Sequence, residues 1–208
     1  NFHGRTMTAV SASTDPKSRG GFGPYLPGIE TVPFGDVAAL DLALQDPDVC
    51  AFIVEPIQGE AGVLVPEVGY LKKVRELCTK HNVLFVADEV QTGLCRTGKM
   101  LACDHEGVKP DLLILGKALG GGVLPVSAVL GSNEIILTIQ AGEHGSTFGG
   151  NPLACAIAMA SLKVLIDEKL AERASDLGEK FRSEIRSWNS PIVADVRGRG
   201  LLNAVEIK

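Results

Sequence analysis

L-F-V-A-D-E-V-Q-T-G (residues 84–93) is the stretch that decides the fold, because a run of apolar residues stops there at two acids and a polar turn. A short continuous apolar run is typical of a strand buried in a parallel sheet. We predict strands of this kind at Val49–Val54, Val83–Ala87, Leu112–Leu115 and Val126–Leu130. The first three are followed by Glu55, Asp88 and Gly116-Lys117. Because ligands gather at the carboxyl ends of parallel strands, we expect two acids and an amine at one shared edge.

Helical patterns lie between and after these strands. Caps, prolines and apolar residues at helical spacing predict helices over Asp36–Leu44, Pro66–Lys80, Asn151–Lys169 and Leu170–Trp188. This alternation predicts an α/β fold with a mostly parallel sheet over residues 36–165. Two more predicted strands, Val193–Val196 and Leu201–Ile207, indicate the start of a smaller α+β unit. We therefore expect a large domain over residues 1–165, a truncated small domain over 166–208, and a long functional loop before residue 36.

The composition is that of a globular chain with an ordinary core. Apolar residues make up 45% of the 208 residues and the formal net charge is −5, which argues against a nucleic-acid partner. No apolar run approaches the roughly 20 residues of a membrane helix, so no membrane partner is expected. The first residue is Asn1 and the last lie in a strand-like pattern, so we expect an internal piece of a longer chain whose targeting segment is not visible.

The five cysteines contain no C-x-x-C pair and their number is odd. Three of them lie in apolar stretches, so we expect reduced, mostly buried thiols of an intracellular protein. Asp88, Glu89 and His105 lack the close spacing of zinc ligands, and no metal site is expected.

Lys117 lies in G-K-A-L-G-G-G (residues 116–122), where glycines leave room for a planar ligand against the backbone. Burial would lower the pKa of such an amine and make it a nucleophile suited to Schiff-base chemistry. Two alternatives are a plain surface lysine and a phosphate loop, although the spacing G-x-x-x-x-G-K-[ST] is absent. Asp88, 29 residues earlier, suits the carboxylate that keeps the ring nitrogen of pyridoxal phosphate protonated.

A second glycine-rich stretch, G-E-H-G-S-T-F-G-G-N-P (residues 142–152), runs directly into a predicted helix. Its amides and hydroxyls would suit a phosphate group. A glycine-rich entry to a helix is also common without any ligand, and the stretch is not a G-x-G-x-x-G fingerprint.

Five ordered motifs together resemble one family. They are F-H-G-R-T (2–6), E-P-I-Q-G-E-A-G (55–62), A-D-E-V-Q-T-G (87–93), L-G-K-A-L-G-G-G (115–122) and G-S-T-F-G-G-N-P (145–152). This set closely resembles the class III aminotransferases, which depend on pyridoxal phosphate, and the resemblance extends over essentially all 208 residues. It implies the fold type I of pyridoxal-phosphate transferases, with a mostly parallel large domain. Local cues such as G-F-G-P-Y-L-P-G (21–28) and G-E-H-G-S-T (142–147) are most similar to the members that act on ornithine.

The resemblance also implies a role for each matching position. Lys117 would form the Schiff base and move the substrate proton, while Asp88 would pair with the pyridinium nitrogen. The other implied cofactor contacts are Gln91 at the phenolic oxygen, Val90 and Phe2 on the two ring faces, and Ser146 and Thr147 at the phosphate of the neighbouring subunit. The implied substrate contacts are Arg5 at the α-carboxylate, Glu60 masking an arginine beyond Lys208, and Glu55 in a supporting hydrogen bond.

The implied reaction transfers the δ-amino group of L-ornithine to 2-oxoglutarate, giving glutamate 5-semialdehyde and glutamate in a homodimer with shared sites. Acetylornithine or 4-aminobutyrate as amino donor, or a non-catalytic α/β binding module, are the alternatives. The family's upstream phosphate loop and substrate-contacting tyrosines would precede Asn1, so we expect the isolated chain to be inactive or very weak. We expect a cytoplasmic protein, with the mitochondrial matrix as the alternative.

Overall fold

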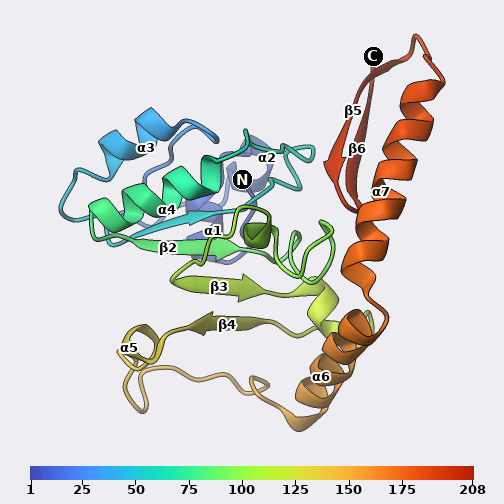
Figure 1. The fold of residues 1–208 in the computed structure, drawn as a ribbon. Helices are drawn as coiled ribbons and strands as arrows, with labels where there is room; N and C mark the ends of the chain where they lie inside the picture. The colour runs from blue at the N-terminus through green and yellow to red at the C-terminus, as the bar shows by residue number, and fades with distance from the viewer.

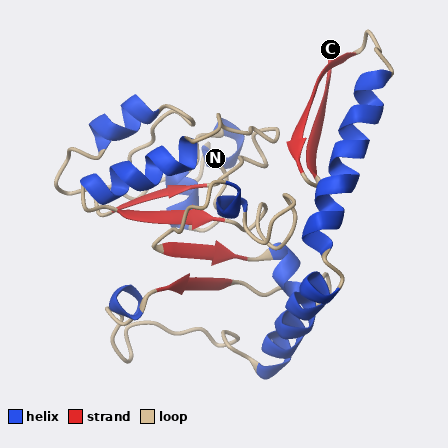
Figure 2. Cartoon of the chain, in the orientation of Figure 1, coloured by secondary structure: helices blue, strands red, loops and turns tan.

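The computed structural model describes all residues from Asn1 to Lys208. Its elements, in chain order, are α1 (Met7–Ala12), α2 (Pro16–Arg19), α3 (Val37–Ala43), β1 (Ala51–Val54), α4 (Tyr70–Lys80), β2 (Leu84–Asp88), the 3₁₀ helix η1 (Ala102–His105), β3 (Leu112–Leu115), the 3₁₀ helix η2 (Lys117–Gly120), β4 (Ala128–Gly131), α5 (Asn133–Ile136), α6 (Pro152–Asp167), α7 (Leu170–Ser187), β5 (Val193–Arg199) and β6 (Leu202–Ile207). Strands and helices alternate as predicted, and Figures 1 and 2 show the sheet flanked by helices.

The main sheet has the strand order β1-β2-β3-β4. The first three strands are parallel, with Phe52 opposite Phe85 and Asp88 opposite Ile114, which confirms the mostly parallel sheet. β4 runs antiparallel to β3, a direction that the sequence pattern did not reveal. The reason is the connection over residues 116–127, which holds only the single turn η2. A parallel return normally needs a crossover helix long enough to carry the chain back along the sheet.

The core lies between the sheet and the helices α3 and α4. Leu40, Val74, Cys78 and Phe85 are each almost completely buried there. The side chain of Asp36 caps α3 by accepting from the amide of Ala39 at 2.9 Å, as its position before the apolar run predicted. α3 and α4 therefore shield one face of the strands whose ends carry the predicted site.

Three features near the predicted site differ from the sequence-based prediction. α4 begins at Tyr70 rather than near Pro66, because Gly69 has φ of +90° and cannot continue a helix. Residues 1–36 contain the short helices α1 and α2 within the predicted loop region. β1, predicted as a buried strand, is an edge strand in which only Val54 is buried.

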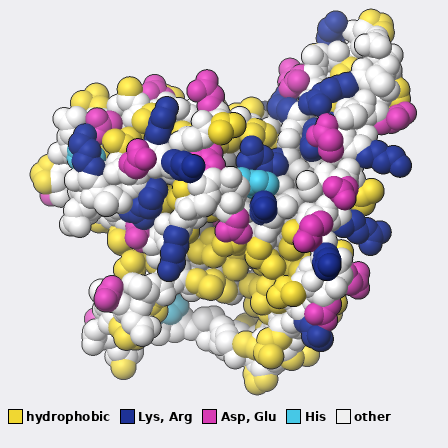
Figure 3. All heavy atoms as spheres, in the orientation of Figure 1, with side chains coloured by type: hydrophobic (Ala, Val, Ile, Leu, Met, Phe, Trp, Pro, Cys, Tyr) yellow, Lys and Arg dark blue, Asp and Glu magenta, His cyan; other side chains and the backbone are white.

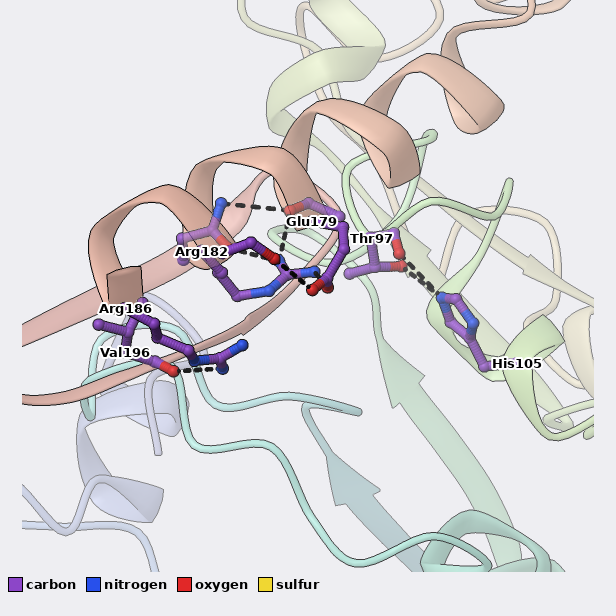
Figure 4. A network of polar contacts seen from close by, with 9 residues as sticks. Thr97, His105, Glu179, Arg182, Arg186 and Val196 are labelled. Atoms are coloured by element: carbon purple, nitrogen blue, oxygen red, sulfur yellow. Dashed lines mark hydrogen bonds and ion pairs between the residues drawn. The ribbon is translucent and has the colours of Figure 1, made fainter. Parts of the chain in front are cut away.

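α7 packs against the antiparallel β5–β6 hairpin on the side toward which β2 and β3 point (Figure 1). Gly178 is essential to this contact, since a Cβ there would lie 1.7 Å from the carbonyl oxygen of Gly200. Arg182 Nη1 donates to the same oxygen at 2.9 Å, and Arg186 donates to the carbonyl of Val196 at 2.7 Å (Figure 4). The hairpin is thus fixed to one face of α7.

The hairpin also contacts the loop that follows β2. The amide of Leu201 donates to the carbonyl of Arg96 at 2.8 Å. His105 Nε2 lies 3.0 Å from the carbonyl oxygen of the neighbouring Thr97 (Figure 4). Burial, and then the charge of Arg199, lowers the pKa of His105. The loop after β2 and the turn of the C-terminal hairpin are therefore joined directly.

α6 is apolar on almost every side and lies at the outside of this chain. Its exposed side chains include Leu153, Met159, Val164 and Ile166. Hydrophobic side chains also gather over the lower middle of the face in Figure 3, toward α6. A helix that is apolar all round is typical of one covered by protein. None of the helices combines the length and apolar character needed to cross a bilayer.

Candidate cofactor and substrate site

Asp88, the last residue of β2, has two hydrogen-bond partners at the predicted edge. Its Oδ2 lies 2.8 Å from Nδ1 of His3, and both side chains are only 8% exposed. Its Oδ1 accepts from the amide of Val90 at 3.1 Å. His3 is a residue that the sequence analysis missed, because 85 residues separate it from Asp88. Its place inside F-H-G-R-T was the only available signal.

The strand end of β1 holds the N-terminal segment in place. Glu55 Oε1 accepts from the amide of Phe2 at 2.9 Å, and its Oε2 accepts from the amide of Gly59 at 3.1 Å. Arg5 lies over the ring of Phe2, with its guanidinium carbon 5.5 Å from the ring centroid. Phe2, Arg5 and Glu55 therefore form one group beside Asp88's partner His3.

Gln91 is held by the loop that follows β1. Its Nε2 donates to Glu60 Oε1 at 3.1 Å. Gly59 lies so close that an added Cβ would be 2.4 Å from Gln91 Oε1. The glycine is thus required for the loop to approach the amide.

Lys117 opens η2 immediately after β3, with a φ of +41°. A non-glycine residue in this left-handed region is strained, and such strain concentrates at functional sites. Gly116 precedes it, and a Cβ there would lie 3.3 Å from Cγ1 of Val90. Lys117 is exposed in this chain, which matches the alternative of a surface lysine and not the buried amine considered for Schiff-base chemistry. Ser161 of α6 anchors the turn by donating to the carbonyl of Ala118 at 2.8 Å.

A cavity of about 950 Å³ connects several predicted residues. Its lining includes Val90, Gln91 and Lys117 together with Arg96 and residues of α6. Asp88 is not part of that lining, since His3 and the N-terminal segment cover it. The amine, the amide and the apolar Val90 therefore share one space, and the acid lies on the neighbouring strand end behind them.

Ser146 and Thr147 are not brought to this cavity. Both are exposed, and Ser146 Oγ accepts only from the amide of Gly149 within its own turn, at 3.0 Å. The segment leads into α6, where Asn151 caps the helix by accepting from the amide of Ala154 at 2.9 Å. The predicted cap and the proline at the first helical position are confirmed.

Glu89 supports the site from inside and was not among the predicted residues. Glu89 is 1% exposed, and its carboxylate accepts from Thr92 Oγ1 and from the amides of Ala102 and Cys103, all within 2.8 Å.

Cys78, Cys95 and Cys103 are buried free thiols, whereas Cys50 and Cys155 are exposed. Burial raises the pKa of the Cys78 thiol to about 11. Neither Glu89 nor any of the five cysteines lines the cavity.

The donor set suits an aromatic aldehyde with a basic ring nitrogen. A primary amine is available for the aldehyde, a buried carboxylate for the nitrogen and an amide for a phenolic oxygen. Gly59 and Gly116 keep the adjoining backbone clear of side chains. The residues present therefore fit pyridoxal phosphate.

The parallel strands, with an amine after β3 and a carboxylate ending β2, define the fold type I of pyridoxal-phosphate enzymes. The family model described as aminotransferase class III matches residues 1–208, so the chain belongs to the class III aminotransferases. Members of this family use pyridoxal phosphate. The family resemblance and the fold class expected from the motifs are both confirmed.

Individual relatives are similar over the whole chain. The mitochondrial ornithine aminotransferase of Rattus norvegicus is 62% identical over 208 residues, which are 100% of this chain and 47% of that protein. The ornithine aminotransferase of Bacillus subtilis is 57% identical over 207 residues, covering 100% of this chain and 51% of that one. The crystal structure of the Toxoplasma gondii ornithine aminotransferase has a TM-score of 0.98 at 55% identity, covering 100% and 50%. A second structure of that enzyme is described with partial occupancy of pyridoxal phosphate at its active site. The chain thus spans about half the length of these relatives.

Proposed function

We propose that the full-length protein transfers the δ-amino group of L-ornithine to 2-oxoglutarate, forming glutamate 5-semialdehyde and glutamate. The observation that carries this proposal is the shared cavity of Lys117, Gln91 and Val90, with Asp88 ending the next strand. Identities of 57–62% to proteins named ornithine aminotransferase support the choice of amino donor.

The proposed cofactor contacts divide between the strand ends. Lys117 would hold pyridoxal phosphate covalently, and Asp88 would hold the proton on its ring nitrogen. Gln91 would donate to the phenolic oxygen, while Val90 and Phe2 would pack on the ring faces. When bound, the cofactor supplies an electron sink for the pair of electrons left when a proton leaves the substrate carbon. The freed Lys117 amine is the general base that removes this proton and the acid that returns it.

The proposed substrate contacts lie next to these groups. Arg5 would bind the α-carboxylate of ornithine and so direct the distal amine toward Lys117. Glu60 would keep a further arginine occupied until the 2-oxo acid binds. Glu55 would support the site indirectly, since its carboxylate fixes both Phe2 and Gly59.

We also propose a homodimer in which Ser146 and Thr147 bind the cofactor phosphate of the partner subunit. Their exposure, remote from the cavity lined by Lys117, supports this arrangement. The exposed apolar side chains of the adjoining α6 support a protein surface that covers them.

The proposed division of the chain is a pyridoxal-phosphate-binding large domain over residues 1–165 and the beginning of a small domain over residues 166–208. We propose the cytoplasm as the compartment, with the mitochondrial matrix as the alternative suggested by the name of the rat relative. Subcellular fractionation of the source cells followed by detection of the protein distinguishes the two.

The function is tested on the full-length protein after addition of pyridoxal phosphate. We expect borohydride to fix the cofactor on Lys117, where mass spectrometry of the peptides locates it. We also expect a higher kcat/KM for L-ornithine than for N-acetylornithine or 4-aminobutyrate. A preference for either of those amines replaces the proposed donor, and absence of any adduct on Lys117 rejects the proposal.

A further inference from the structure

Arg197, on β5, connects the C-terminal hairpin to the loop over residues 59–63. Its Nε donates to the carbonyl oxygen of Gly62 at 2.9 Å, across a separation of 135 residues. Its Nη1 donates to Asp195 Oδ2 at 2.8 Å and to Glu206 Oε2 at 2.7 Å. One guanidinium therefore bonds to the hairpin through one nitrogen and to the large-domain loop through another.

The two carboxylates fix the orientation of this guanidinium. Asp195 and Glu206 are direct partners in the β5–β6 register, where two like charges would otherwise repel each other. The Arg197 guanidinium relieves that repulsion, and its hydrogen bond lowers the pKa of Asp195. Because a guanidinium is planar and rigid, holding Nη1 on the two carboxylates also sets the direction in which Nε points.

The loop that receives this bond is tight and closed at its base. Gln58 and Leu64 pair across it through two backbone hydrogen bonds of 3.1 and 2.9 Å. Gly62 has φ of +107°, and a Cβ there would lie 3.2 Å from Nη2 of Arg197. A glycine is therefore needed both for the turn and for the approach of Arg197.

The same loop holds the amide that lines the cavity of Lys117. Glu60 accepts from Gln91 Nε2 at 3.1 Å, and the backbone of Gly59 lies against the other end of that amide. A displacement of the loop would therefore move Glu60 and leave Gln91 without its partner. Arg197 itself does not line the cavity.

We propose that Arg197 is a positioning residue, which acts through the loop over residues 59–63 to set the places of Glu60 and Gln91. The inference rests on the proposed function for its kinetic consequence. A dicarboxylic 2-oxo acid carries more negative charge than the amino donor, so it responds more strongly to the position of the Glu60 carboxylate. Arg197 thereby helps to set the balance between the two substrates.

The decisive variant is Arg197→Lys in the full-length protein. The lysine ammonium can still pair with Asp195 or Glu206, but it has no second nitrogen to donate to Gly62. Glu206→Gln is the matched control, since it removes one ion pair and leaves the Nε bond in place. Amide hydrogen exchange of residues 59–63 reports on the loop without requiring any activity.

In Arg197→Lys we expect amide exchange in residues 59–63 to accelerate by roughly three- to tenfold, the effect of losing one hydrogen bond. We expect a change of similar size in the ratio of KM for 2-oxoglutarate to KM for ornithine, with kcat changed less than twofold. Both quantities should stay within about twofold of wild type in Glu206→Gln. In a Glu60→Gln background, the effect of Arg197→Lys on the KM ratio should disappear, because the carboxylate that it positions is gone.

Unchanged exchange in Arg197→Lys overturns the connection. Equal KM shifts in Arg197→Lys and Glu206→Gln, or a shift that persists in the Glu60→Gln background, overturn the positioning role. A wild-type protein that lacks transamination contradicts the proposed function instead, and the exchange measurement still decides whether Arg197 holds the loop.

Discussion

The ends of β1 and β2 and the segment over Leu137–Gly150, both proposed to contact the cofactor, differ in how much of their bonding comes from distant parts of the chain. At the ends of β1 and β2, Glu55, Asp88 and Gln91 all have hydrogen-bond partners from distant parts of the sequence. Along Leu137–Gly150, by contrast, every residue is exposed and Ser146 bonds only within its own turn. Figure 1 shows this segment running from α5 to α6 along the outside of the sheet.

The difference agrees with the proposed shared site, in which the strand ends would form the half that is complete within one chain. The strand ends are fixed within the chain, so their geometry is available before any ligand arrives. The side chains of the exposed segment, in contrast, bond only to residues close to them in the sequence, as Gln140 does to Leu137 and Ser146 to Gly149. Substitutions at three positions test this contrast and one at a fourth position tests stability, from the largest expected effect to the smallest.

Lys117→Ala removes the amine from the complete half. We expect transamination by the full-length protein to fall by at least about 10³-fold, because both covalent attachment and general base catalysis are lost. The borohydride-fixed adduct should disappear, while the melting temperature of the cofactor-free protein is unchanged. Activity within tenfold of wild type would contradict the role of Lys117.

Asp88→Ala tests the buried carboxylate. We expect a loss of roughly 10²- to 10³-fold in kcat, typical of removing a preorganised electrostatic group. The protein should also lose about 1–3 kcal/mol of stability, because His3 and the Val90 amide lose their buried acceptor. Asp88→Asn, which keeps the size, should recover part of the stability but little of the rate. A wild-type rate in both variants would reject the pyridinium role.

Thr147→Ala tests the exposed half. We expect about a tenfold weaker affinity for pyridoxal phosphate, measured by fluorescence titration, because one hydrogen bond to a charged phosphate is lost.

Mixed dimers test directly whether the site is shared between two subunits. Combining Thr147→Ala and Lys117→Ala subunits leaves one site with both native residues, so each mixed dimer should show about half of the wild-type activity. At a pyridoxal-phosphate concentration well below the Kd of Thr147→Ala, failure of mixing to raise activity above that of Thr147→Ala alone would contradict a shared site.

His105 gives the smallest effect, on stability rather than on rate. Burial lowers the pKa of His105, so its contribution is fully present above the unfolded pKa of about 6.5 and is lost as the pH falls below that value. We expect the melting temperature to decrease between about pH 7.5 and 5.5, and to decrease less steeply in His105→Gln. Equal slopes for the two proteins would assign the pH dependence to other groups.

The strands that end at the proposed site, and the start of α6, were largely predictable from the sequence. β3 was predicted with its observed bounds and β2 to within one residue, because each is a continuous apolar run followed by a polar break. The cap of α6 was equally clear from Asn151 and Pro152. These features depend on neighbouring residues, which a single sequence displays directly.

Contacts between distant residues were not predictable in this way. Nothing in the pattern around Asp88 indicates His3, and nothing around Arg197 indicates Gly62, since the pairs lie 85 and 135 residues apart. The direction of β4 was also hidden, because apolar spacing is the same in either direction. The exposure of Lys117 was left open, because the sequence pattern fits both a buried amine and a surface lysine.

The left-handed backbone at Lys117 has a consequence for anyone who would engineer this scaffold. A glycine would adopt a φ of +41° without cost, whereas any side chain there gives up on the order of 1 kcal/mol of folding free energy. The chain thus has an amine at this position, where a glycine would give a higher free energy of unfolding. A binding protein built on the same framework, with no chemistry to perform, would gain thermal tolerance from Lys117→Gly alone.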